Sequence, residues 1–374
     1  MKRKPVLAAG VGAAALALVA SGCSSNSSSG STSTSKPLIG IILPDEVTSP
    51  RWANADQPAL QAQCTKDGLQ CDIQNAEDSD TNEVTIGTTM INVEHVQVLM
   101  VAGVDPAPTE TITNLAHKNG VKVIDYDRAY GDPDYYMSFN GVTVGVDQGK
   151  ALLAAIAAQH ITNPDVAVLD GSPTDGNATE FKQGYLSVLN PLFANGTLHK
   201  SAEQAVTGWS NPLAATDFQS MYAQDPHINV IMVANDGMAD AIIPFLQQQN
   251  IAGKVVVSGQ DASALGLQDI LLGYQSFTIY KASSLEAVPA VDLAKELVDG
   301  TTNPTGVDGQ KFVSQKYSTT TNSVPSILAT PETITLANVD VPVKSNYTPF
   351  STVCTTAQLQ QLCTTNGVVN PSGS

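Results

Sequence analysis

Short runs of apolar residues alternate with longer segments of helical periodicity from Pro37 to about residue 300. Runs such as residues 38–43 (LIGIIL) and 230–234 (VIMVA) are apolar at nearly every position. Such runs are typical of parallel strands that helices cover on both faces. The expected strands are residues 38–43, 69–74, 96–102, 121–126, 166–169, 228–234, 254–258 and 276–280, and the expected helices are 52–64, 83–93, 109–117, 142–160, 180–193, 238–250 and 284–299.

The alternation of strands and helices occurs in two stretches of similar size, before and after about residue 141. A chain of this length has room for two domains. The pattern therefore predicts an α/β protein with two doubly wound, Rossmann-like lobes.

The amino-terminal residues have the layout of an export signal. Three basic residues (Lys2, Arg3 and Lys4) precede an apolar run over 6–20, and small residues lead to Cys23. This run is shorter than the roughly 20 residues that a membrane span needs. The segment resembles a bacterial lipobox, although Ala20 stands where leucine is usual. We expect a signal peptide over 1–22, a lipid on Cys23, and a Ser-rich tether over 23–36 that holds the protein at the extracytoplasmic face of the cell membrane. An ordinary signal peptide with an incidental cysteine is the alternative.

The other four cysteines form two local pairs in the sequence. Cys64–Cys71 and Cys354–Cys363 is the simplest of three pairings, and disulfides persist in an exported protein. Metal binding is the alternative, but the spacings are not C-x-x-C and no histidine lies near either pair. The five histidines have no metal-ligand spacing either, so we expect no metal and no cofactor.

The chain is acidic, with 35 Asp and Glu against 18 Lys and Arg and a formal net charge of -17. No basic patch is visible in the sequence, which argues against a nucleic-acid partner.

Polar and aromatic side chains follow nearly every predicted strand. In open parallel sheets, ligands bind beyond the carboxyl ends of the strands. Carboxylates, amides and cations can hydrogen-bond to hydroxyl groups, and an indole ring can cover the C–H face of a sugar. Singly, an Asp or Asn at such a position often only caps the next helix. The residues that follow the strands are Arg51, Trp52, Asp127, Arg128, Asp175, Asn177, Trp209, Asn235, Asp261 and Lys281.

With these residues, the chain resembles the type I periplasmic sugar-binding proteins of ABC transporters, and most closely their xylose-binding members. The resemblance extends from about residue 37 to about residue 333. It rests on eight short motifs in order along the chain: Arg51-Trp52, residues 125–128 (DYDR), 136–139 (YMSF), 171–178 (GSPTDGNA), 207–209 (TGW), 234–236 (AND), 258–262 (SGQDA) and 278–281 (TIYK).

The resemblance implies two lobes that are joined by a hinge and close on a sugar. The amino-terminal lobe would contain residues 37–141 and about 282–315, the second lobe 142–281 and about 316–340, and residues 341–374 would be an extension with a disulfide. The implied ligand-binding residues are Arg51, Trp52, Arg128, Asp175, Asn177, Trp209, Asn235, Asp261 and Lys281, with Trp209 as the stacking platform. The implied partners are a monosaccharide, D-xylose or another pentose, and a transporter permease, and the protein would be a monomer.

Three rival functions and one other ligand class compete with this interpretation. The sugar-sensing domain of a transcription repressor shares this fold, but it needs a DNA-reading helical headpiece, and residues 1–36 have the pattern of an export signal and a tether. Asp175 and Asp261 could serve glycoside hydrolysis, but the chain has no G-x-S-x-G motif and no phosphate loop, so we expect no enzyme. A receptor domain that reports sugar to a membrane signalling partner would need the same pocket. A hexose such as glucose or galactose would need a change in one or two side chains.

Overall fold

The computed structural model describes residues 38–317 and 321–371. The predicted signal peptide, the predicted lipidation site Cys23 and the predicted tether lie outside these residues. Within the described part, no helix has the length and apolar character that crossing a membrane requires.

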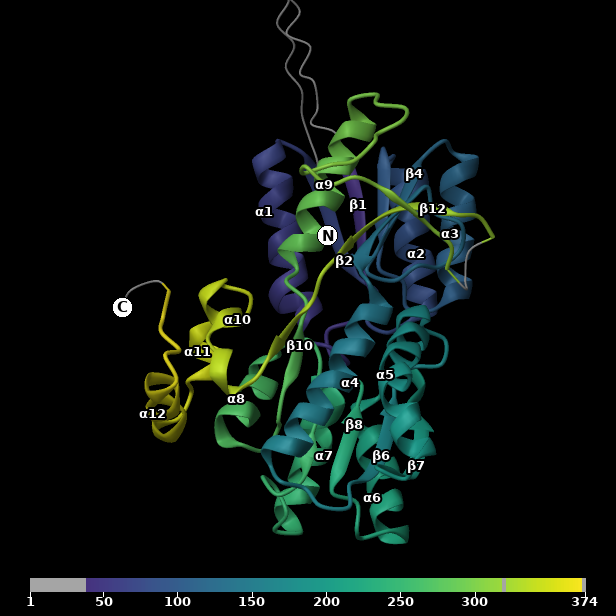
Figure 1. Ribbon diagram of the computed structural model, residues 1–374. Helices are drawn as coiled ribbons and strands as arrows, with labels where there is room; N and C mark the ends of the chain where they lie inside the picture. Colours follow the sequence, from purple (N-terminus) through teal and green to yellow (C-terminus); the bar gives the residue numbers. More distant parts are fainter. Residues whose placement is uncertain (1–37, 318–320, 372–374) are drawn as a thin grey trace, which may run out of the picture. The chain divides into compact units, whose positions relative to one another are not determined.

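The first sheet has seven strands, and it forms the core of the first lobe (Figure 1). These strands are β1 (Leu38–Leu43), β2 (Gln70–Asn75), β3 (Val98–Val101), β4 (Lys122–Tyr126), β5 (Tyr135–Phe139), β11 (Val313–Gln315) and β12 (Val324–Ala329). Their order is β11-β12-β5-β4-β3-β1-β2, and all neighbours are parallel except β11 and β12.

Helices cover both faces of the first sheet, as continuous apolar strands require. In β3, Val98 and Met100 belong to one hydrophobic cluster, whereas Leu99 and Val101 belong to another on the opposite face. The first cluster includes residues of α1 and α9, and the second includes residues of α2 and α3. These helices are α1 (Gln57–Asp67), α2 (Asp80–Thr89), α3 (Pro106–Lys118) and α9 (Ser284–Val298).

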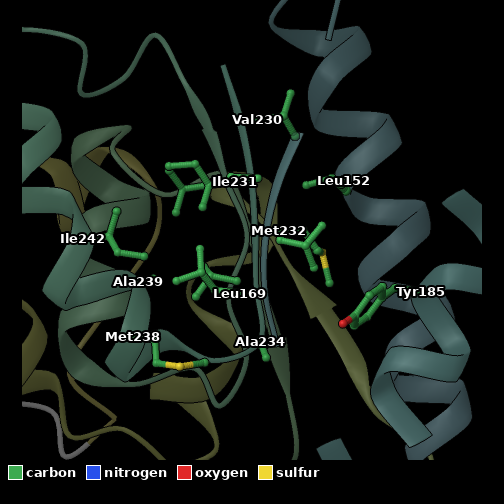
Figure 2. Packing of buried hydrophobic residues seen from close by; sticks show 14 of the residues in the cluster. Leu152, Leu169, Tyr185, Val230, Ile231, Met232, Ala234, Met238, Ala239 and Ile242 are labelled. Carbon is green, nitrogen blue, oxygen red and sulfur yellow. The ribbon is translucent and has the colours of Figure 1, made fainter. Parts of the chain in front are cut away.

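The second sheet has four parallel strands in the order β7-β6-β8-β9. Figure 2 shows its core: Met232 points toward Leu152 and Tyr185 on one face, and Ile231 points toward Ile242 on the other. The strands are β6 (Asp165–Asp170), β7 (His199–Ala205), β8 (Val230–Val233) and β9 (Val256–Val257), and the helices are α4 (Gly141–Ala158), α5 (Gly176–Ala194), α6 (Asn211–Gln224) and α7 (Asp236–Gln248). The two sheets therefore confirm the predicted α/β fold.

The chain passes between the two sheets three times. The passages follow β5, β10 (Thr278–Tyr280) and β12, and after the last one the chain forms β13 (Glu332–Ile334). Strand β10 pairs with β13 in a separate antiparallel sheet of two strands. These neighbouring segments connect the lobes, and they lie where a hinge is expected.

One predicted lobe boundary is wrong. Residues 316–340 were expected in the second lobe, but β12 pairs with β5 in the first sheet. The parallel register joins Ile327 to Met137, so the chain returns to extend the first sheet before it crosses to β13. The pairing partner is almost 200 residues away in sequence, and no local pattern specifies it.

The sequence pattern also missed several elements with a weak apolar signal. Strand β7, in which every residue is exposed or half-buried, has the sequence HKSAEQA and is an edge strand of the second sheet. Helix α6 was missed as well, and α8 (Ala264–Leu272) was missed although its sequence, ALGLQDILL, is strongly apolar.

The carboxyl-terminal extension packs against α8. It contains α10 (Val341–Lys344), α11 (Phe350–Val353) and α12 (Ala357–Thr365), and Figure 1 shows these helices beside α8. Val343, Val353 and Leu359 share a hydrophobic cluster with Leu267 and Ile270. The structure contains both predicted disulfides, Cys64–Cys71 and Cys354–Cys363.

Candidate ligand-binding site

A cavity lies where the carboxyl ends of strands from both sheets meet. All nine predicted ligand-binding residues line it, so the structure brings them together from segments up to about 230 residues apart. The lining residues are Thr48, Ser49, Arg51, Trp52, Asp127, Arg128, Asp175, Asn177, Phe181, Trp209, Asn235, Gln260, Asp261 and Lys281.

Arg51 is buried among three carboxylates at the start of the π-helical turn Trp52–Asp56. A guanidinium has five N–H donors. Its Nε and Nη2 bind Asp56 at 2.8 Å each, Nη2 also binds Glu286 at 2.6 Å, and Nη1 binds Asp127 at 2.8 Å. Burial lowers the pKa of Arg51, but the carboxylates outweigh that effect and hold the pKa above its ordinary value. Four donors are used by described residues, which leaves one Nη1 donor for a ligand.

Asp127 contacts two cations through its carboxylate and contacts the second lobe through its backbone carbonyl. Its Oδ2 lies 2.8 Å from Arg51 Nη1 and 3.5 Å from Lys281 Nζ. Burial raises the pKa of Asp127, but Lys281 and Arg51 outweigh burial, so the net pKa is lowered and the carboxylate stays charged. Its carbonyl accepts a hydrogen bond from Asn177 Nδ2 in the second lobe at 2.8 Å. The backbone of Asp127 has a φ of 63°, which is uncommon outside glycine.

A second chain of contacts connects Arg128 to Trp209. The Nε of Arg128 lies 3.2 Å from Asp175 Oδ2, and Trp209 Nε1 donates to the same oxygen at 3.0 Å. Burial raises the pKa of Asp175, although the charge of Arg128 opposes this. Since Arg128 follows β4 and Asp175 follows β6, this ion pair crosses from one lobe to the other.

Two polar atoms of the lining have no hydrogen-bond partner among the described residues. Trp52 Nε1 and Gln260 Oε1 are both buried and unpaired. The Trp52 ring also lies beneath the guanidinium groups of Arg51, at 4.6 Å from its centroid, and of Arg128, at 5.5 Å. An unpaired buried donor and acceptor cost free energy unless a ligand or water meets them, so this cavity suits a ligand with hydroxyl groups.

Direct contacts already join the two sides of the cavity. Ser49 Oγ donates to Asp261 Oδ2 at 2.7 Å, and Asn235 Nδ2 donates to the carbonyl of Thr48 at 3.4 Å. At the rim, Asn211 Nδ2 donates to the carbonyl of Val47 at 3.3 Å. The residues after β1 therefore bind to residues after β8 and β9.

Asp175 and Asn235 each cap a helix and also line the cavity. Asp175 Oδ1 accepts from the amide of Asn177 at the start of α5, and Asn235 Oδ1 accepts from the amide of Met238 at the start of α7. Both residues also line the cavity. Helix capping orients these side chains, and their remaining polar atoms face the opposite lobe.

Five lining residues are not among the nine implied ligand-binding residues, namely Thr48, Ser49, Asp127, Phe181 and Gln260, although Asp127 was singled out as a residue that follows a strand. Asp127 and Gln260 follow strands directly, so their positions were a usable signal. Phe181 lies inside α5 and Ser49 in a loop, and neither position has a local signature.

One group of described residues has the spacing of metal ligands, although none was expected. Asp165, His199 and Asp225 offer ligand atoms within 4.8 Å of one another. They meet because β6 and β7 begin side by side, with Asp165 opposite His199 in the register. His199 Nδ1 lies 2.9 Å from Asp165 Oδ1, and Ser201 Oγ donates to Asp225 Oδ2 at 2.7 Å. The group lies at the opposite end of the second sheet from the cavity.

Comparisons with known proteins agree with this architecture. A family model for the periplasmic binding protein domain matches residues 39–302. The D-xylose-binding periplasmic protein of Escherichia coli (strain K12) is 30% identical over 312 residues, which cover 81% of this chain and 88% of that protein. The multiple sugar-binding periplasmic receptor ChvE of Rhizobium radiobacter is 28% identical over 322 residues, covering 82% and 88%.

Solved structures show the same fold. A solute binding protein of an ABC transporter from Clostridium phytofermentans, with bound β-D-glucose, has a TM-score of 0.75 and 23% identity, covering 84% of this chain and 99% of that chain. A carbohydrate transporter solute binding protein from Chloroflexus aurantiacus, in complex with D-glucose, has a TM-score of 0.73 and 24% identity, covering 85% and 98%.

Proposed function

Because the chain belongs to the periplasmic binding protein family, we propose that it binds one monosaccharide between its lobes and delivers it to the permease of an ABC importer. This is a family of binding proteins, which confirms the prediction that the chain is not an enzyme. The proposed ligand-binding residues are the nine predicted from the sequence, together with Asp127 and Gln260.

The chemistry of the cavity supports a sugar as the ligand. The lining offers cationic donors from Arg51, Arg128 and Lys281, and acceptors from several carboxylates and amides. A sugar hydroxyl both donates and accepts, so it can bridge such groups. The observation that carries the proposal is that unpaired Trp52 Nε1 and Gln260 Oε1 come from opposite lobes and line one cavity.

Closure of the hinge would couple binding to transport. A ligand held by both lobes favours the closed form over the open form, because each lobe alone makes only part of the contacts. A permease that recognises the closed form would then receive loaded protein. The contacts between Ser49 and Asp261 and between Arg128 and Asp175 would form during this closure.

D-xylose or another pentose is the proposed sugar. The name of the Escherichia coli relative supports xylose, whereas the two solved structures contain glucose, and a hexose is therefore the alternative ligand. A sensing role is the alternative function, because the Rhizobium radiobacter relative is named a receptor.

Calorimetry with xylose, ribose, arabinose, glucose, galactose and inositol tests the ligand class. We expect one or a few of the five monosaccharides to bind with a 1:1 stoichiometry, and the cyclitol inositol tests whether a ring of hydroxyl groups alone is enough for binding. Both tryptophans of the chain line the cavity, so intrinsic fluorescence should shift with the same sugar and the same affinity. A flat response to every monosaccharide in both measurements would exclude the proposed ligand.

We also propose that lipid attached to Cys23 holds the protein at the extracytoplasmic face of the membrane. The names of the relatives place them in the periplasm, which supports export. Expression in a bacterium tests the anchor, since Cys23→Ser should move the protein from the membrane fraction to the soluble fraction. An unchanged distribution would exclude lipidation at Cys23.

A further inference from the structure

The ligand-binding residue Asp261 lies on strained backbone. Its φ is 98°, and Ala262 after it has a φ of 48°, both in the region that favours glycine. Two consecutive residues with a side chain in this conformation persist only where the surroundings hold them. The strain determines the direction of the Asp261 side chain, whose Oδ2 accepts from Ser49 at 2.7 Å.

The carboxyl-terminal extension holds both strained peptides by their carbonyl groups. Tyr347 donates its hydroxyl to the carbonyl of Asp261 at 2.9 Å, and Thr348 Oγ1 donates to the carbonyl of Ala262 at 2.8 Å. All four residues are buried. The amide of Asp261 donates to the carbonyl of Ile279 at 2.8 Å, so the backbone of Asp261 is held at both its amide and its carbonyl.

The extension also closes a second cavity behind the site. Arg51 and Asp261 line both cavities, and the far wall of the second cavity contains Tyr347, Thr348 and Thr352. Packing holds the extension there, because the Tyr347 ring meets the Tyr280 ring edge-on with centroids 4.9 Å apart. The cluster that contains both rings also includes the Cys354–Cys363 disulfide.

We propose that the extension is a positioning device for the sugar site, in which Tyr347 and Thr348 hold the backbone of Asp261 and Ala262 so that the Asp261 carboxylate faces the ligand. This inference rests on the proposed function. Tyr347 acts through Asp261 and does not line the first cavity, so it is a positioning residue.

Tyr347→Phe tests the proposal, and Tyr280→Phe is its matched control. Each substitution removes one hydroxyl from the same hydrophobic cluster and keeps the ring. The Tyr280 hydroxyl pairs with Ser345 Oγ at 2.8 Å, within the contact between β10 and the extension, and it does not touch the strained peptides. Loss of packing or of general stability should therefore affect both variants, whereas loss of positioning should affect Tyr347→Phe alone.

Two measurements on the full chain separate this inference from the proposed function. Calorimetry with the best-bound monosaccharide should show affinity about fivefold weaker for Tyr347→Phe, since one neutral hydrogen bond is lost, and within twofold of wild type for Tyr280→Phe. Hydrogen exchange without sugar should show faster exchange of the amides of Asp261 and Ala262 in Tyr347→Phe only.

The outcomes decide between the two claims. Wild-type affinity and wild-type exchange in Tyr347→Phe would overturn the positioning role while leaving sugar binding intact. Equal losses in both variants would also overturn it, because they would indicate a purely structural contact. If no monosaccharide binds the wild-type protein, the proposed function fails, and the exchange of the Asp261 and Ala262 amides still decides whether the extension holds this backbone. Thr348→Val should accelerate exchange at Ala262 and serves as a second variant.

Discussion

The charged side chains that line the cavity are buried, and each one is stabilised by ion pairs or hydrogen bonds with neighbouring groups. Arg51 has three carboxylate partners, and Asp127 joins Arg51 to Lys281. Buried charges are tolerated only when they are paired and hydrogen-bonded. The cavity is therefore a network in which the proposed sugar would complete hydrogen bonds that the protein leaves open, as at Trp52 Nε1.

Substitution of Asp261 tests the contribution of a single residue to binding. Asp261→Ala removes the acceptor of the Ser49 hydroxyl and the carboxylate that lies 3.6 Å from Lys281 Nζ. We expect sugar affinity to fall by at least about 2 kcal/mol, because buried donors are left unpaired. Calorimetry measures the loss, and Asp299→Ala, which changes an exposed ion pair with Lys295, is the control. An unchanged affinity for Asp261→Ala would remove this residue from the site.

At the scale of secondary-structure elements, helices α4 and α5 pack closely through glycines. A Cβ at Gly184 would lie 2.3 Å from the carbonyl oxygen of Val142 and 2.7 Å from Gly145 Cα. These are backbone atoms, which cannot turn aside as a flexible side chain can. The close approach positions α5, whose first residues include Asn177.

Gly184→Ala should destabilise the protein although alanine favours helices. Overpacking against backbone typically costs about 1–3 kcal/mol, which we expect to exceed the gain of about 1 kcal/mol from helix propensity. Gly149→Ala in the same interface is the matched control, since its Cβ would meet Val188 Cβ at 3.0 Å and no atom closer. Urea denaturation should show a larger loss for Gly184→Ala, and equal losses would contradict this account of the helix contact.

Glu83 connects α2 to the segment that leads into α3, and it makes stability depend on pH. Its carboxylate accepts from the amide of Val104 and from Thr109 Oγ1, at 2.6 Å each. Burial raises the pKa of Glu83 to about 7, from an ordinary value of 4.5. The folded state therefore binds a proton that the unfolded state releases between these pH values.

The sign of the pH effect follows from this difference. A carboxyl with a raised pKa contributes most to stability at low pH, and that contribution is lost as pH rises toward and past about 7. Burial raises the pKa of Asp236 to about 7 as well, with the same sign. We expect the free energy of unfolding to fall from pH 5 to pH 8. Glu83→Gln should reduce the slope of the unfolding free energy against pH. Denaturation curves at several pH values measure this slope, and an unchanged slope would contradict the raised pKa of Glu83.

At the scale of the whole molecule, closure is the property that connects structure to transport. The described residues show contacts between the two sides of the cavity, so a sugar in it would lie between both lobes. An open form must exist for a sugar to enter, and the segments after β5, β10 and β12 are the positions for the hinge.

Small-angle scattering tests the closure in solution. Adding a bound monosaccharide should lower the radius of gyration, because the ligand favours the form in which both lobes contact it. A sugar that does not bind is the control. An unchanged radius of gyration at saturation would indicate that binding occurs without movement of the lobes.

The sequence alone predicted much of the first and second sheets, and the nine candidate residues that it singled out all line one cavity. Apolar runs and helical periodicity are local patterns, and the ends of parallel strands meet at one edge, so the position of Arg128 or Asn235 in the chain indicates its position in the fold. Strand β7 and helix α6 were missed because their apolar signal is weak.

Only the tertiary structure decided the features that depend on residues far apart in the chain. The return of β12 to the first sheet requires pairing with β5, and the contact of Tyr347 with Asp261 spans 86 residues. No local pattern carries such information, because the free energy of these contacts comes from packing that exists only after the lobes have folded. The residues of the site are therefore determined by the sequence, whereas their support and enclosure are determined by the fold.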